Sequence, residues 1–380
     1  MTTAVQVSNL LAQAQALVSK SWEHGVFCET LIEVMNPELS IFAPNEVDPF
    51  PDGEIPKLGK GDIEKCAALK WASSNEVGMR QSVELGPAEL VKRRRGDDAA
   101  GDPASLGIPA LLIGTFNHDY HTAACRQANL LLTRVPRTSK GAISHRYDVA
   151  EAWSDFVYMV PPFLAYLSVS TGEIDYLNTA LTQIHLYRDE LRISEGQHAG
   201  QWRHIIGPQN QDKGAWASGC GWAAMGMARV LATVMKWRTT RDWKDEQAQL
   251  KGYILELLNG ALASPRDPAK MLLRNYLNDE TYSGEAAGTA LLAATAYRMA
   301  VLVPDYFGPD GFGGKYLAWA DDGRIAVEKC IDENGLVAPV VNPLRHLQRE
   351  PLDGGSPEGQ CFAALMFAAY SDYLAQFKRQ

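Results

Sequence analysis

The stretch WSDFVYMVPPFLAY, residues 153–166, decides the fold of this chain. Apolar side chains follow one another through it, so no face of a helix built from it would be polar. A helix that is apolar all round is buried in the interior of a large protein. Its one acidic residue, Asp155, comes at the start. The stretch therefore predicts a buried helix with a carboxylate at its opening.

The same pattern, a small or polar opening before a long apolar run, occurs in four other segments: 101–114, 219–235, 284–300 and 356–373. More amphipathic helices are expected after the first four of these five helices, at 118–133, 173–191, 243–263 and 313–331. The openings at Trp153, Gly219 and Glu285 are 66 residues apart, the length of one helical hairpin with its loops. Alternating buried and half-exposed helices indicate stacked helix pairs.

These pairs predict an all-α fold. With a further helix at 3–20 and one within 61–75, the chain holds eleven or twelve helices, which suits an (α/α)6 toroid of six hairpins. An open solenoid is the alternative, but its repeats are usually about 33 to 47 residues long. We expect a single domain over residues 1–380. Two irregular segments interrupt it: the proline-rich arm 37–60, which should pack across the helices, and the loop 83–101.

Composition excludes several classes of protein. The net charge of −9 argues against nucleic-acid binding, and the one basic run, residues 92–95, is followed at once by two aspartates. No apolar run is long enough to span a membrane, and residues 1–20 lack the pattern of a secretory signal. The six scattered cysteines suggest neither disulfides nor zinc, so we expect a cytoplasmic protein without a metal or other cofactor.

Parallel inner helices would gather their openings at one end of the ring. Unpaired backbone N–H groups and the positive ends of the helix dipoles would then face a common cavity. Two or more acids beside several indole rings are typical of a carbohydrate site, because indoles stack on sugar faces and carboxylates move protons. The residues expected there are Asp102, Trp153, Asp155, Trp216, Trp222, Glu285 and Glu358.

Structural roles compete for each of these acids. Asp102 could cap the helix that begins at Pro103, and Asp155 could be paired, capping or active in acid chemistry. For Glu358 and Glu285 a structural role is the better interpretation. His118 and His121 share a helix face, but no third ligand at helical spacing accompanies them, which argues against a metal.

The segments 136–172, 201–222 and 356–373, with GDPASLG at 101–107, together resemble the six-hairpin glycosidase superfamily. The resemblance is to the unsaturated rhamnogalacturonyl hydrolases of glycoside hydrolase family 105, especially fungal ones. It implies hydration of the C4=C5 bond of an unsaturated uronyl oligosaccharide. Asp155 would be the general acid and base, and Asp102 a supporting carboxylate. His204, Trp216, Trp222, Trp153, Tyr158 and Ser218 would contact the substrate.

Two positions depart from that family. Its members commonly carry an arginine and an asparagine where this chain has Ser218 and Cys220. An arginine fork suits anionic sugar groups, so its replacement leaves other functions open. One is a repurposed barrel, a cyclase, isomerase or hydratase acting on a non-sugar molecule in secondary metabolism. Another is a barrel that binds a ligand without catalysis. The oligomeric state is left open.

Overall fold

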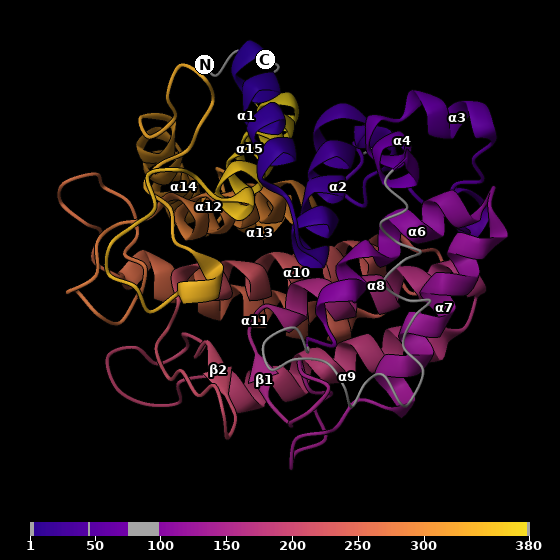
Figure 1. Ribbon diagram of the computed structural model, residues 1–380, viewed down its shortest axis with the longest axis horizontal. Coiled ribbons are helices and arrows are strands. Elements are labelled where there is room, and N and C mark those ends of the chain that lie inside the picture. Colours follow the sequence, from indigo (N-terminus) through magenta and orange to yellow (C-terminus); the bar gives the residue numbers. More distant parts are fainter. Residues whose placement is uncertain (1–3, 45, 75–98, 378–380) are drawn as a thin grey trace.

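The computed structural model describes residues 4–44, 46–74 and 99–377 (Figure 1). Its helices are arranged as an inner ring and an outer ring. Within these residues, each helix of the inner ring contacts the next, and the last contacts the first. The ring is therefore closed, and the predicted all-α toroid is confirmed. Its six helices are α2 (Ser21–Met35), α6 (Gly107–Gly114) with the preceding 3-10 turn η3 (Asp102–Leu106), α8 (Phe156–Thr171), α10 (Ala217–Lys236), α12 (Ala286–Leu302) and α15 (Pro357–Phe377).

Each inner helix has an outer partner packed against it. The outer helices are α4 (Ala67–Ser74), α7 (His118–Thr133), α9 (Ile174–Leu191), α11 (Lys244–Ala263), α14 (Gly314–Glu328) and α1 (Ala4–Leu17). The sixth pair joins the two ends of the chain, because α1 packs on α15 (Figure 1). Short helices α3 (Lys60–Lys65) and α13 (Pro304–Phe307) lie in the connections.

Inner helices are buried over nearly their whole length because the outer ring covers them. Two of them approach so closely that only glycine fits. A Cβ atom at Gly226 in α10 would lie 2.2 Å from the carbonyl oxygen of Val157 and 2.6 Å from the Cα atom of Tyr158, both in α8. Real Cβ atoms do not come that close, so the glycine is what allows this contact between backbones.

Helix α2 is the inner helix that the apolar pattern did not identify. It carries three buried acids, and the charges of two of them are compensated by arginines from other inner helices. Glu33 binds Arg229 of α10, and its other oxygen lies 2.7 Å from Arg298 of α12. Glu29 also lies 3.3 Å from Arg229. These ion pairs connect α2 to the opposite side of the ring.

The arm at 37–60 packs across the helices as expected. Its regular structure in the described residues is limited to the 3-10 turns η1 (Pro37–Leu39) and η2 (Pro51–Gly53) and the first residue of α3. Ile41, Phe42 and Phe50 are all buried. Most of the loop predicted at 83–101 lies outside the described residues.

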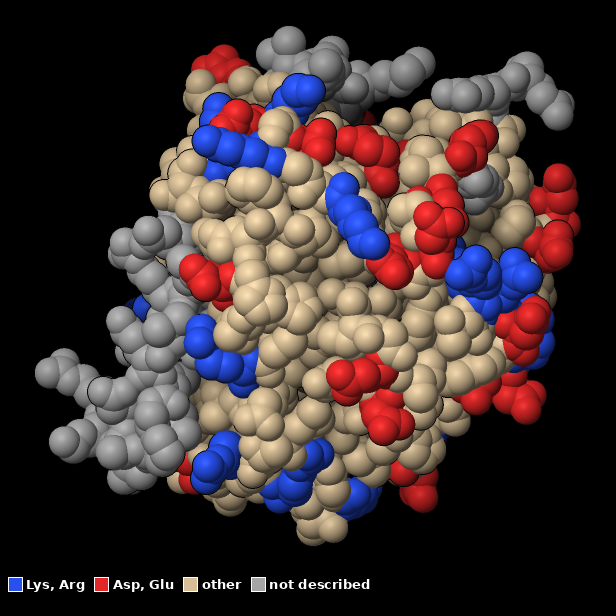
Figure 2. All heavy atoms as spheres, turned by 90° about the vertical axis from the view of Figure 1, so that its right-hand side faces the viewer, with Lys and Arg blue, Asp and Glu red and all other residues tan. Residues whose placement is uncertain are grey.

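On the face shown in Figure 2, small groups of acidic and basic side chains alternate around an uncharged centre. Among the described residues, no helix combines the length and the apolar character needed to cross a membrane.

Candidate active site

Residues from five inner-helix openings surround one cavity. Trp22 comes from α2, Asp102 from η3, Asp155 from the residue before α8, Trp216 from the residue before α10, and Glu358 from α15. Trp153, His204 and Trp222 line the same cavity. Helix N-termini therefore meet at this end of the ring, where their dipoles favour negative charge.

Asp155 is paired rather than capping. It precedes the first residue of α8, and its side chain makes no capping hydrogen bond to the described backbone. Its Oδ2 atom lies 3.5 Å from Nε2 of His204, whereas Oδ1 has no hydrogen-bond partner among the described residues. The side chain lines the cavity although the residue is only 8% exposed. One carboxylate oxygen thus faces an imidazole, and the other is buried without a partner among the described residues.

A short β-ribbon holds Asp155 beside His204. Strand β1 (Ala152–Trp153) pairs antiparallel with β2 (Ile205–Ile206), with Trp153 opposite Ile205. Just beyond this pair, the Ser154 N–H donates to the His204 carbonyl over 2.9 Å. Two loops that are far apart in sequence are therefore fixed in register directly at the carboxylate.

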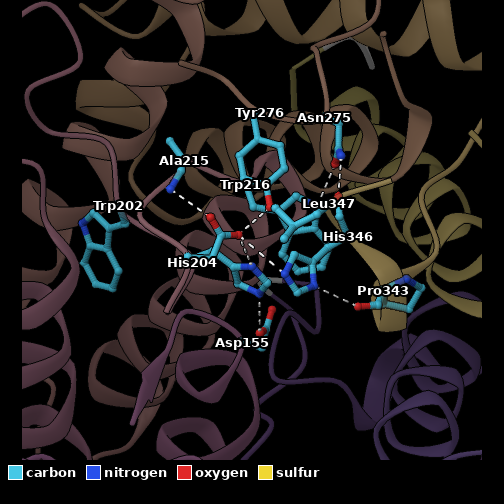
Figure 3. A network of polar contacts seen from close by, with 12 residues as sticks. Asp155, Trp202, His204, Ala215, Trp216, Asn275, Tyr276, Pro343, His346 and Leu347 are labelled. Atoms are coloured by element: carbon cyan, nitrogen blue, oxygen red, sulfur yellow. Dashed lines mark hydrogen bonds and ion pairs between the residues drawn. The ribbon is translucent and has the colours of Figure 1, made fainter. Parts of the chain in front are cut away.

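Asp212 contacts the His204 ring at Nδ1, whereas Asp155, labelled beside His204 in Figure 3, lies at Nε2. Its Oδ2 atom is 3.0 Å from His204 Nδ1 and also accepts a hydrogen bond from the Tyr276 hydroxyl. Its Oδ1 atom accepts from the Gly214 N–H over 3.0 Å. Burial opposes ionisation of Asp212, but these hydrogen bonds outweigh it and lower the pKa of its carboxyl.

His204 consequently bridges two carboxylates. Burial disfavours its charged form, but the hydrogen bonds to Asp155 and Asp212 outweigh burial and raise the pKa of the imidazole. With Nδ1 facing Asp212, Nε2 presents its proton to Asp155. His346 stands edge-on to His204, with ring centroids 4.4 Å apart, and burial and the neighbouring His204 charge lower its pKa.

Ligand atoms of His204, Asp212 and His346 lie within 4.8 Å of one another, so these three residues could hold a metal ion. The contacts describe a hydrogen-bond network instead, because Asp212 Oδ2 is shared by His204 Nδ1 and the Tyr276 hydroxyl. His118 and His121, the two histidines that share a helix face, lie in the first turn of α7, where their rings stack with centroids 5.7 Å apart.

Asp102 has its own imidazole partner. Its Oδ1 atom lies 3.3 Å from Nε2 of His145, whose ring stacks on Trp153 with centroids 4.9 Å apart. Glu151 accepts a hydrogen bond from the Trp153 indole N–H over 3.0 Å, which fixes that ring. The cavity thus contains two carboxylate–imidazole pairs, with the Trp153 ring between the two imidazoles.

The remaining tryptophans are held just as firmly. The Trp216 indole N–H donates to the Asn275 side-chain oxygen over 2.8 Å, and the Asn275 amide donates to the His346 carbonyl. Trp222 contacts Phe362 edge-on with centroids 4.6 Å apart. Rigid indole rings of this kind are suited to stacking on sugar rings.

Tyr158, Ser218 and Glu285 are not among the described residues that line the cavity. The Tyr158 hydroxyl instead accepts a hydrogen bond from Arg229 in the core. Ser218 Oγ lies 3.5 Å from Glu285, whose carboxylate accepts from two N–H groups in the first turn of α12. Of the proposed substrate contacts, Tyr158 and Ser218 are thus placed away from the site.

A family model describes this chain. The model of Glycosyl Hydrolase Family 88 matches residues 90–299, more than half of the 380 residues. The chain belongs to glycosyl hydrolase family 88. This membership confirms the predicted resemblance to the six-hairpin glycosidase superfamily. It also confirms that the chain is a glycosidase of carbohydrate metabolism. No curated protein matches the chain.

Solved structures share the fold of this family 88 chain. A possible member of family 105 from Salmonella enterica serovar Paratyphi A is 15% identical, with a TM-score of 0.65 over 96% of this chain and 92% of that one. A family 105 glycoside hydrolase from C. acetobutylicum is 12% identical, with a TM-score of 0.69 over 98% and 99%. The unsaturated glucuronyl hydrolase from Bacillus sp. GL1 is 14% identical, with a TM-score of 0.55 over 94% and 97%.

Several residues at the site of this family 88 chain escape sequence reasoning. Asp212 could have been found as the acid between His204 and Trp216 in a glycine-containing loop. His145 stands in GAISHRYD, a mixed apolar and polar stretch just before Asp155, which points to it only weakly. His346 and Trp22 carry no local signal, because the fold brings His346 to His204 and Trp22 to the cavity from distant parts of the chain.

Proposed function

We propose that Asp155 is the general acid and base with which this hydrolase of unsaturated uronyl glycosides hydrates the C4=C5 bond. The supporting observation is that the two oxygen atoms of its carboxylate have different surroundings. Oδ2 faces the His204 imidazole, Oδ1 is buried without a partner among the described residues, and the side chain lines the cavity. Family membership and the fold shared with an unsaturated glucuronyl hydrolase agree with this chemistry.

The reaction divides into two proton transfers at one carboxyl group. Protonated Asp155 gives its proton to C4, and the positive charge that develops at C5 is shared with the ring oxygen. The resulting Asp155 anion is stabilised by the imidazolium of His204, 3.5 Å away. The anion then takes a proton from water as that water adds to C5. Asp155 is thereby protonated again. The hemiketal at C5 opens as its hydroxyl proton passes to the ring oxygen, and the hemiacetal left at C1 then releases the next sugar with that proton.

The other cavity residues bind and orient the sugar. Asp102, held by His145, is placed to accept hydrogen bonds from sugar hydroxyl groups. Trp153 and Trp216 offer indole surface near the reacting carboxylate, where a sugar ring can stack. A bound ring held this way meets Asp155 in a fixed orientation, which contributes to the rate.

Loss of the ultraviolet absorbance of the conjugated double bond tests this function. Purified protein should remove the absorbance of an unsaturated glucuronyl or galacturonyl disaccharide, and Asp155→Asn should not. If the wild-type protein left the absorbance of both disaccharides unchanged, the proposed function and with it the assignment to Asp155 would be rejected. Turnover of a non-sugar substrate that requires Asp155 would favour the repurposed-barrel alternative instead.

The expected cytoplasmic location stays a prediction. In support, all six cysteines are free, and four of them are buried. Free buried thiols are usual in a reducing compartment. Such a location would have the enzyme act on oligosaccharides that have already been taken up.

A further inference from the structure

Glu358 is a buried acid with one oxygen uncommitted. It lies in the first turn of α15 and is only 4% exposed. Its Oε1 atom accepts a hydrogen bond from the Trp22 indole N–H of α2 over 2.7 Å, while Oε2 has no partner in the part of the chain that the structure describes. The cap of this helix is Ser356, whose Oγ accepts from the Gly359 N–H. Ser356 thus supplies the N-cap, and the Glu358 carboxyl has a hydrogen bond only with its own backbone N–H and with Trp22 among the contacts that affect its pKa.

The charges around Glu358 are mostly negative. Glu23 of α2 and Asp155 before α8 both disfavour its anion. Asp102 of η3 lines the same cavity, with its imidazole partner His145, and so does His204. The thiol of Cys361 lies close to it on α15. Arg146 also lines the cavity, but its guanidinium forms a fork with Asp148 at 3.0 and 3.3 Å.

Burial, reinforced by the Glu23 charge, raises the pKa of the Glu358 carboxyl to about 7. Below that pH the group is a neutral carboxylic acid. Its single proton can then sit on Oε2, because Oε1 already accepts from Trp22. A neutral acid that donates to a carboxylate forms one of the short, strong, charge-assisted hydrogen bonds found in proteins.

We propose that Glu358 binds the carboxylate of the uronyl substrate by donating a hydrogen bond from Oε2. This inference rests on the proposed function and names the group that recognises its substrate class. Position 218, where related hydrolases commonly carry an arginine, is a serine that faces Glu285. As a neutral acid, Glu358 can meet a substrate carboxylate beside Asp155 and Asp102 without adding a further negative charge to the cavity.

Calorimetric binding of D-glucuronate tests the inference without requiring turnover. The wild-type protein should bind this probe about tenfold more weakly at pH 8 than at pH 6, since a group with a pKa near 7 loses most of its proton over that interval. Glu358→Gln keeps a donor at this position at every pH and can still accept from Trp22. Its affinity should therefore fall less over the same interval, by only the part that the cavity histidines contribute.

Glu285→Gln is the matched control. Glu285 is also a buried acid at the start of an inner helix, and burial raises its pKa to about 7, but the described contacts place it outside the cavity. This variant should show the wild-type pH dependence. Glu358→Ala, which has no donor, should bind weakly at both pH values.

Equal pH dependence in wild type and Glu358→Gln would overturn the inference, and so would a wild-type protein that does not bind glucuronate. A purely structural Glu358 would alter the unfolding temperature of its variants but not their pH dependence of binding. Failure of the proposed function looks different: glucuronate binds as expected, but the unsaturated disaccharide is not consumed.

Discussion

Asp212 Oδ2 lies 3.0 Å from His204 Nδ1, on the opposite side of the imidazole from Asp155. His204 is therefore a bridge between Asp212 and Asp155, the carboxylate that we propose as the general acid and base. Its buried charge is tolerated because both ring nitrogens face an acid. The predictions for catalysis follow from this line of three groups.

Replacing Asp155 by asparagine should abolish hydration of the double bond. The amide cannot protonate C4, and general acid–base catalysis is worth about 100- to 10,000-fold in rate. The measurement is kcat/KM from the loss of ultraviolet absorbance. Asp245→Asn, an exposed acid on α11, serves as the control and should keep full activity. Comparable activity in the two variants would remove Asp155 from the mechanism.

Replacing Asp212 by asparagine should narrow the active pH range from the alkaline side. The negative charge of Asp212 helps to raise the pKa of His204, so its loss lowers that pKa. Protonated His204 then disappears at a lower pH, and with it the stabilisation of the Asp155 anion. A pH profile of kcat/KM shows the shift, and nuclear magnetic resonance titration of His204 assigns it.

Tyr276→Phe is the companion variant for Asp212. It removes one hydrogen bond to the carboxylate but leaves its charge beside His204. In its pH profile of kcat/KM, the alkaline limb should therefore lie closer to the wild-type limb than the alkaline limb of Asp212→Asn does. Coincident alkaline limbs in wild type and Asp212→Asn would show that the His204 charge is not needed.

Alanine at Gly226 should destabilise the ring. The added Cβ would collide with the backbone of α8, and overpacking of this kind costs about 1–3 kcal/mol in the free energy of unfolding. Gly252→Ala in α11 is the control, because no atom lies within 4 Å of the added methyl group among the residues considered. Urea denaturation should show a loss for the first variant and a small gain, about 1 kcal/mol or less, for the second.

Truncating Arg298 should cost more than truncating a surface arginine. Arg298 to alanine leaves Glu33 with one ion pair fewer and removes the partner of Asp372, and breaking a buried pair typically costs about 3–5 kcal/mol. Arg241→Ala, at an exposed position after α10, should change the free energy of unfolding little. Similar unfolding midpoints for both variants would mean that the buried network contributes no net stability.

The apolar pattern predicts five of the six inner helices because the outer ring buries them on every side. It fails for α2, since Glu23, Glu29 and Glu33 give that segment the composition of an outer helix. Glu29 and Glu33 are compensated by Arg229 and Arg298, which lie far along the chain, so no local window contains the reason for their burial.

The candidate site divides in the same way. Asp155 and Asp102 follow from their places at helix openings, whereas His346 reaches His204 only through the fold. For Ser218 the sequence context and the position differ: Trp216 and Trp222 line the cavity, whereas the Ser218 side chain lies beside Glu285. The roles of the site residues and the single-domain organisation stay predictions.

The pairing of α1 with α15 has a consequence for how the molecule is made. Trp22 and Glu358 are separated by 336 residues, yet their hydrogen bond forms one wall of the cavity. On the ribosome, five pairs of helices can stack as they emerge, but the wall between α2 and α12 stays open until α15 is synthesised. Such long-range closure slows folding and exposes apolar surface in the meantime. The cavity is therefore complete only when α15 docks against α2 and α12.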